Sequence, residues 1–311
     1  MDCKWWRQAQ VRLLDMKKTH IICIILFVVF VATETALRLC WGFGTMPLYV
    51  ASKQYEYIFA PNQQMKRFGV YFYTNSYSQR SAEPDNNKKK ILGLGDSVIN
   101  GGSQTDHDSL ATSIVSANTE YQMLNISAGS WGPDNCAAYL KEHGLFDAKA
   151  MFVVLSSHDV DDSMDFAPIV GVHKSFPCEQ YMLAINEVVD RYIIPRLLKP
   201  ATTLDPNEKV LKGIDKGGEF NKGWDQLKQI ASDAHIPLVV ILHAELSELK
   251  AGDYNDKGKM IEQWATENDI RLVKDITYLK EENYRDQIHI NQSGQKILAE
   301  IIMSELSAMS I

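Results

Sequence analysis

The chain has 311 residues, of which 45% are hydrophobic and 23% charged, a balance typical of a globular protein with a substantial core. This composition excludes a mainly disordered chain, and 18 glycines and 10 prolines are too few for a fibrous protein. The net charge of −7 divides into +3 over residues 1–19 and −10 over the rest (−7 − 3 = −10), so the body is acidic and a poor partner for nucleic acid.

The first predicted element is an apolar helix. Residues 21–32 read IICIILFVVFVA, and extension to residue 43 gives roughly 35 Å of helix, enough to cross a bilayer. Glu34 and Arg38 interrupt the run, but their i,i+4 spacing lets them face each other near one end. Because cations precede the run, the positive-inside rule keeps residues 1–20 in the cytoplasm. We expect an uncleaved single-pass anchor over 21–43; a cleaved signal peptide and a buried core helix are the alternatives.

Residues 44–84 are rich in polar and aromatic side chains, and we expect a connector that packs on the following domain, residues 85–311. In that domain, short apolar runs alternate with helical stretches. This alternation predicts a parallel sheet covered by helices on both faces. The expected strands are one that starts at 91 and ends at the turn beginning with Gly95, then 123–127, 150–156, 237–243 and one from 270. The expected helices are about 105–119, 134–144, 180–198, 218–235, 256–268 and 291–306.

Two short motifs carry the candidate chemistry. Gly95, Asp96 and Ser97 follow the first strand directly, which puts a serine hydroxyl at a strand-to-helix turn on the ligand side of the sheet. Asp286 precedes His289 by three residues, just before the last helix. A histidine can take the proton of a serine hydroxyl, and a carboxylate on its other ring nitrogen orients it. Each motif alone is also explained by ordinary turn and capping residues.

In combination, the motifs resemble the SGNH/GDSL hydrolase family. The matching pieces are LGLGDS at 92–97, NISAGSWG at 125–132, LSSHD at 155–159 and DQIHIN at 286–291, within residues 88–306. The resemblance implies a three-layer α/β/α sandwich with a parallel, flavodoxin-like sheet of five strands. It also implies a catalytic triad of Ser97, His289 and Asp286, a three-donor oxyanion hole, and ester hydrolysis or acyl transfer without a metal or cofactor.

Two positions depart from the family's pattern. The glycine whose N–H serves the oxyanion hole is expected five residues after Asn125, where this chain has Ser130. The asparagine of the third piece is replaced by His158, whose ring N–H is still a donor. We therefore expect an oxyanion hole of the Ser97 and Ser130 N–H groups with His158. A slow or inactive member of the family is the alternative, because losing one such donor costs about 2.7–4 kcal/mol.

Three further side chains are candidates for lining a substrate pocket: Trp131, Asp159 and His243, with core packing or local hydrogen bonding as the alternative. The acidic loop that begins at Asp159 lacks the glycine and glutamate pattern of a calcium site, so no metal is expected. Residues 165–215 look like a lid-like insertion that closes over the site. Cys136 and Cys178 either pair in an oxidising compartment or remain free thiols.

The sequence therefore predicts a membrane-anchored serine esterase with its catalytic domain outside the cytoplasm, periplasmic or extracellular. The expected partners are the membrane and an acylated carbohydrate or lipid substrate. An O-acetyl ester of an envelope carbohydrate fits that location by analogy. The alternatives are an O-acyltransferase of the same fold and a catalytically degenerate protein that binds glycan. The sequence leaves the oligomeric state open.

Overall fold

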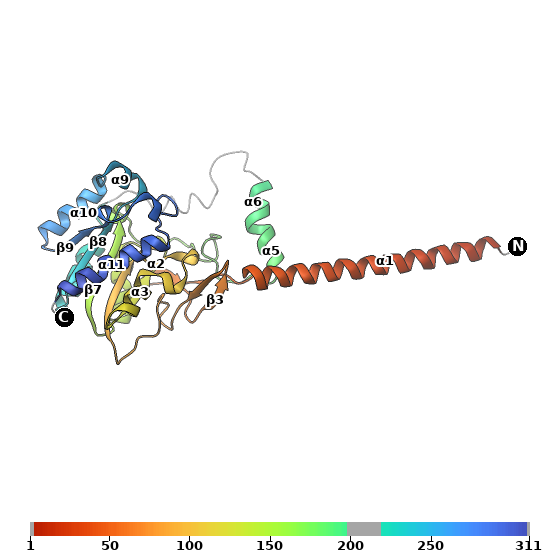
Figure 1. Cartoon of the computed structure of the whole chain (residues 1–311), viewed down its shortest axis with the longest axis horizontal. Coiled ribbons are helices and arrows are strands. Elements are labelled where there is room, and N and C mark those ends of the chain that lie inside the picture. Colours follow the sequence, from red (N-terminus) through yellow and green to blue (C-terminus); the bar gives the residue numbers. More distant parts are fainter. Residues whose placement is uncertain (1–2, 198–218, 310–311) are drawn as a thin grey trace. The chain divides into compact units, whose positions relative to one another are not determined.

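A computed structural model of the chain describes residues 3–197 and 219–309 (Figure 1). The chain divides into two compact units. One contains residues 1–45 and 180–199, and the other contains residues 46–179 and 200–311. The larger unit carries the sheet, and the smaller one carries the apolar N-terminal helix.

The larger unit is built on a parallel sheet whose five strands run in the order β6-β5-β7-β8-β9. This order, with the second strand of the sheet at one edge beside the first, is that of flavodoxin-like folds. The prediction of a flavodoxin-like α/β fold is confirmed. The strands are β5 (Lys89–Gly95), β6 (Tyr121–Ser127), β7 (Ala148–Ser156), β8 (Leu238–His243) and β9 (Arg271–Lys274).

Helices cover both faces of this sheet, so the unit has three layers (Figure 1). Alternate residues of one strand enter opposite cores, because side chains of a strand point alternately to its two faces. In β7, Val153 belongs to one core and Phe152 to the other. The first core contains α4 (Pro133–His143), α8 (Gly223–Asp233) and α10 (Asp256–Glu267); the second contains α2 (Ser97–Asn100), α3 (Ala111–Asn118) and α11 (Gln292–Ala308).

The helices differ from the sequence prediction in three places. The predicted helix 105–119 is divided into η3 (His107–Ser109) and α3, because Leu110 between them is extended (φ −69°, ψ 142°). A short helix, α9 (Leu246–Ala251), was not predicted. The predicted helix 180–198 begins at residue 184 and is described as far as residue 197. Residues 198–218, which include part of the proposed lid 165–215, lie outside the described residues.

Two antiparallel hairpins form within the segment 44–84. They are β1 (Tyr49–Ser52) with β2 (Glu56–Phe59), and β3 (Gln64–Arg67) with β4 (Val70–Tyr73). The Tyr57 hydroxyl donates to the carbonyl of Gly129 over 2.9 Å, and the Trp131 indole N–H donates to the carbonyl of Tyr57 over 2.8 Å. The first hairpin therefore packs on the loop that follows β6.

The smaller unit begins with α1 (Cys3–Ala36), which continues into the π-helical turn η1 (Leu37–Trp41). Met16–Trp41 spans 26 residues and contains an 18-residue stretch with a mean hydropathy of 2.3, so the helix is long and apolar enough to cross a membrane. The Arg38 guanidinium lies 2.7 Å from the Glu34 carboxylate, the i,i+4 contact that the spacing predicts. A signal sequence passes the same test of length and composition.

Candidate active site

The candidate residues gather at the carboxyl edge of the sheet, where parallel α/β sheets bind their ligands. Ser97 follows β5, and Ser130 lies in the loop after β6. His158 lies in η4 (Ser157–Val160) after β7, and His243 is the last residue of β8. His289 comes from the loop that precedes α11.

The turn that carries Ser97 is shaped by its two neighbours. A Cβ on Gly95 would lie 2.1 Å from the carbonyl oxygen of Val154, so only glycine lets the strand end pass this close to β7. The Asp96 side chain caps the next helix by accepting the N–H of Val98 over 2.8 Å. Ser97 is then the first residue of α2 and remains partly exposed at the edge of the sheet.

Ser97, His289 and Asp286 form one chain of hydrogen bonds. His289 Nε2 lies 2.9 Å from Ser97 Oγ, and His289 Nδ1 lies 2.9 Å from both carboxylate oxygens of Asp286. A carboxylate only accepts, so Nδ1 carries the proton and Nε2 is left to accept from the serine hydroxyl. The structure thus brings together three residues that the sequence separates by as many as 192 positions.

The Asp286 carboxylate also organises its own loop. Its Oδ1 accepts the backbone N–H of His289 over 2.8 Å and that of Ile288 over 3.1 Å. Burial alone would raise the pKa of Asp286, but these two hydrogen bonds and the one from the His289 ring outweigh it and lower the pKa. Asp286 is therefore held as the anion that a histidine partner needs.

Ser130 adopts a backbone conformation that favours glycine. Its φ is +57°, in the left-handed region that costs a non-glycine residue roughly 1–2 kcal/mol. Its carbonyl accepts the Tyr57 hydroxyl over 3.2 Å. Within residues 3–197 and 219–309, no acceptor is found for the backbone N–H of either Ser130 or Ser97. Both N–H groups are consequently free to bind an oxyanion.

His158 is surrounded by carboxylates. Its Nε2 lies 3.4 Å from Asp159 Oδ1 and 4.0 Å from Asp96 Oδ2, and its Nδ1 lies 3.3 Å from Glu245 Oε1. Burial alone would lower the pKa of His158, but these carboxylates raise it well above its usual value. The ring is thus an imidazolium with a donor on each nitrogen. It lies beside Asp96, the residue that precedes Ser97.

The same cluster also has the spacing of a metal site. Asp96, His158 and Asp159 present ligand atoms within 4.8 Å of one another, and they are the one such group in the described parts of the chain. A histidine must be neutral to ligate a metal, whereas the surrounding carboxylates here favour the protonated ring. His158 therefore acts as the counter-ion of the two aspartates.

Three side chains expected to line a substrate pocket are buried instead, so that prediction is wrong. Trp131 is fully buried, and its N–H is taken by the carbonyl of Tyr57. Asp159 is also fully buried and accepts the N–H of Ser156 over 2.7 Å. His243 has no exposed surface, and both of its ring nitrogens are engaged.

The contacts of His243 reveal a buried ion pair that the sequence did not indicate. Its Nδ1 lies 2.6 Å from Asp275 Oδ2, and its Nε2 lies 2.7 Å from the carbonyl oxygen of Ile288. Both partners only accept, so both ring nitrogens carry protons. Burial alone would lower the pKa of His243, but Asp275 and the Ile288 carbonyl raise it to about 9. Asp275 lies 32 residues away after the next strand, and no motif marks it.

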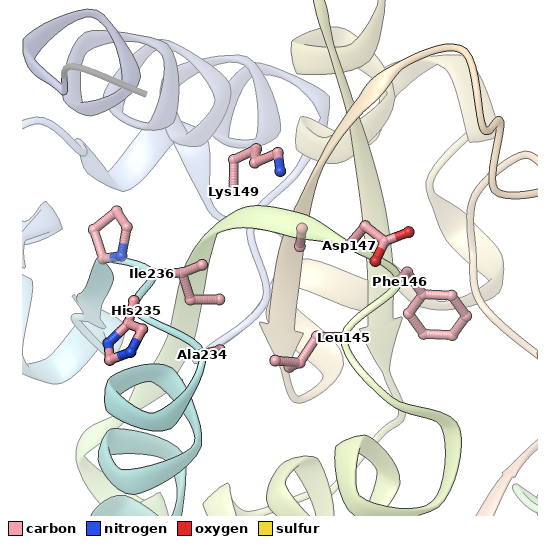
Figure 2. A pocket seen from close by; sticks show the side chains of 9 residues that line it. Leu145, Phe146, Asp147, Lys149, Ala234, His235 and Ile236 are labelled. Carbon is pink, nitrogen blue, oxygen red and sulfur yellow. The ribbon is translucent and has the colours of Figure 1, made fainter.

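A pocket of about 650 Å³ opens at the opposite edge of the sheet (Figure 2). Its walls come from the segments that lead into β7 and β8, including Phe146, Lys149 and His235. This edge is formed by the amino ends of the strands, whereas Ser97 lies at their carboxyl ends. Cys136 and Cys178 are both free thiols; Cys136 is buried and Cys178 is exposed.

No protein-family model and no curated protein matches the chain. Solved structures do resemble it. A lipolytic protein of the G-D-S-L family from Veillonella parvula is 10% identical, with a TM-score of 0.40 over 71% of this chain and 100% of that one. A carbohydrate acetylesterase from Sinorhizobium meliloti is 12% identical, with a TM-score of 0.41 over 71% of this chain and 99% of that one.

An α/β hydrolase from the metagenome of Lake Arreo is 14% identical, with a TM-score of 0.40 over 72% of this chain and 97% of that one. The class of the molecule follows from its own strand order and contacts. It is a three-layer α/β protein with a flavodoxin-like sheet, and a serine–histidine–aspartate hydrogen-bond chain lies at the carboxyl edge of that sheet.

Proposed function

We propose that this chain is a serine ester hydrolase of the SGNH/GDSL family. Ser97 is the nucleophile, His289 the general base, and Asp286 the carboxylate that orients the base. The observation that carries the proposal is the 2.9 Å contact between His289 Nε2 and Ser97 Oγ. A serine hydroxyl becomes an effective nucleophile when an adjacent base accepts its proton and a third group fixes that base.

The reaction follows from these positions. Ser97 Oγ attacks the ester carbonyl carbon while its proton passes to His289 Nε2. The tetrahedral intermediate collapses, the bond from carbon to the alcohol oxygen breaks, and His289 returns the proton to the departing alkoxide. Water then attacks the acyl-enzyme with His289 as the base and releases the acid and Ser97. Asp286 stabilises the imidazolium that forms twice in this cycle.

The developing oxyanion needs donors that are in place before the reaction. The backbone N–H groups of Ser97 and Ser130 supply two of them, which fits the free N–H groups at both positions. His158 supplies the third as an imidazolium. A charged donor stabilises an oxyanion more strongly than the neutral amide of an asparagine.

The apolar helix over Met16–Trp41 supports a membrane location. The cations that precede it favour a cytoplasmic N-terminus and a catalytic unit on the other side of the membrane. An acylated carbohydrate or lipid of the cell envelope is then the substrate within reach, and an O-acetyl ester is the simplest case. Transfer of the acyl group to a sugar hydroxyl instead of water uses the same residues.

The test is covalent labelling of the full-length protein in detergent with a fluorophosphonate, which reacts with activated serines. We expect labelling of Ser97, turnover of p-nitrophenyl acetate, and loss of both in Ser97→Ala. Ser232→Ala, an exposed serine in α8, is the matched control and should behave as the wild type. A folded protein that is neither labelled nor active, but retains glycan binding in Ser97→Ala, would favour the non-catalytic alternative.

A further inference from the structure

A helical segment of the smaller unit is attached to the end of the apolar helix. This segment, which we call the strap, comprises residues 182–197 and includes α5 (Ala184–Val188), η5 (Val189–Ile193) and α6 (Ile194–Leu197). The first two N–H groups of α5, those of Ala184 and Ile185, donate to the two carboxylate oxygens of Glu34 over 2.7 and 3.0 Å. A residue of α1 thus caps the first helix of the strap.

Further contacts hold the strap along the same end of α1. Arg38, which is paired with Glu34, donates from Nη2 to the carbonyl of Met182 over 2.7 Å. The buried Glu187 carboxylate accepts the N–H of Gly44 over 2.6 Å. Phe43 packs edge-on against Tyr192 with 5.6 Å between ring centroids. The polar groups of Glu34 and Arg38, which interrupt the apolar run, therefore bind the strap.

These contacts fix the depth of the strap relative to the apolar helix. Met16–Trp41 has 26 residues, and at about 1.5 Å each its length matches the roughly 40–45 Å of a bilayer with its headgroups. Glu34 is seven residues before Trp41, or about 10 Å from that end. Where α1 spans a membrane, Ala184 lies at the boundary between hydrocarbon and headgroups.

The strap presents apolar side chains at this depth. Val189, Ile193 and Leu197 follow one another at intervals of four residues, which places them on one face of the helix. Leu197 is 76% exposed, and Met182 at the start of the strap is 87% exposed. Leu39, in the turn η1 to which the strap is attached, is 80% exposed. Apolar groups this exposed at a membrane boundary fit a lipid surface.

We propose that the strap docks on the lipid surface of the membrane in which α1 is inserted, so that the unit has two points of membrane contact. The proposal rests on the membrane location given under the proposed function. The continuity of the apolar face with the candidate membrane span selects lipid as the occupant, rather than another protein surface.

The test is depth-dependent quenching in the full-length protein reconstituted in vesicles. Cys3, Cys23, Cys40 and Cys178 are replaced by serine, the buried Cys136 is kept, and one cysteine is introduced for an environment-sensitive fluorophore. The positions are Ile193 and Leu197 in the strap, Val28 in the apolar helix and Ser232 in α8. The vesicles contain lipids brominated either near the headgroups or near the ends of the acyl chains.

We expect the fluorophore at residue 193 or 197 to lose about half of its emission with lipids brominated near the headgroups, and less with deeper bromines. Residue 28 should be quenched more by the deeper bromines, and residue 232 by neither. Quenching at 28 without quenching at 193 and 197 overturns the docking proposal. This holds even if the fluorophore emission at 193 and 197 is blue-shifted, because such a shift without quenching means that protein and not lipid covers the strap. No quenching at 28 overturns the membrane anchor itself, and the docking proposal with it.

Discussion

His243 Nε2 lies 2.7 Å from the carbonyl oxygen of Ile288, the residue that immediately precedes His289. The end of β8 is thereby joined to the loop that carries His289, the proposed general base. Nearby, the Tyr284 hydroxyl donates to the carbonyl of Ala244, and the Tyr284 ring stacks on His243 with 5.7 Å between centroids. The imidazolium of His243 therefore acts as a positioning group for His289, which it does not touch.

Replacing His243 should weaken both stability and catalysis. We expect His243→Gln to lower the free energy of unfolding by about 3–5 kcal/mol, because it leaves the buried Asp275 carboxylate without its counter-charge. The turnover number should fall with little change in KM, since the substrate does not contact residue 243. Tyr284→Phe is the matched control: it removes one hydrogen bond, keeps the stacked ring, and should cost about 1 kcal/mol. Equal losses in the two variants would contradict the role of the charge.

The same pair predicts a loss of stability at alkaline pH. The pKa of His243 is raised from its usual value near 6.5 to about 9, so the folded protein binds this proton more tightly than the unfolded chain does. The contribution of this proton to the free energy of unfolding is fully present below about pH 6.5 and declines as the pH rises through 9. Urea unfolding from pH 6 to 10 should show a difference between wild type and His243→Gln that narrows with increasing pH. A difference that is constant over that range would refute the assignment.

The pairing of Ser97 with His289 was predictable because each residue sits in a short motif at a strand end or before a helix, and such ends meet at one edge of a parallel sheet. The positions of Trp131 and His243 were not. An aromatic or histidine side chain beside a site can face either the ligand or the core. For these two residues, the orientation is set by hydrogen bonds to backbone carbonyls that are far away in the sequence. For Trp131 the partner is the carbonyl of Tyr57, in a hairpin that lies 74 residues earlier.

Asp286 should be essential to turnover without being essential to the fold. In Asp286→Asn the amide can donate to His289 Nδ1, which then carries no proton, and Nε2 no longer accepts the serine proton. We expect a fall in turnover of about 10³–10⁴-fold with p-nitrophenyl acetate. Asp233→Asn, at the exposed end of α8, should keep full activity. Full activity in Asp286→Asn would exclude this carboxylate from the triad.

Ser130 should contribute to catalysis only through its backbone. The φ of +57° suits glycine, so Ser130→Gly should keep its activity and change stability by less than about 1 kcal/mol, the strain relieved being offset by the entropy of glycine. Ser130→Val keeps the N–H but forces a β-branched side chain into the left-handed region, where it is most strained. We expect Ser130→Val to lower both the melting temperature and the turnover number. If Ser130→Gly lost activity while its fold was intact, the hydroxyl and not the N–H would be the group that matters.

His158 tests whether a charged donor has replaced an amide in the oxyanion hole. His158→Ala removes the donor and should lower kcat/KM by about 10²–10³-fold, the usual loss for one oxyanion donor. It also leaves Asp96 and Asp159 without their cation, so its folding must be measured alongside its activity. His158→Asn retains a neutral N–H donor on a shorter side chain and should recover part of the activity that His158→Ala loses, at equal stability. Glu245→Gln, which removes one carboxylate beside Nδ1 and leaves the ring in place, should lower the pKa of His158 while preserving activity at neutral pH. If His158→Ala were folded and as active as the wild type, the oxyanion hole would consist of the two backbone donors alone.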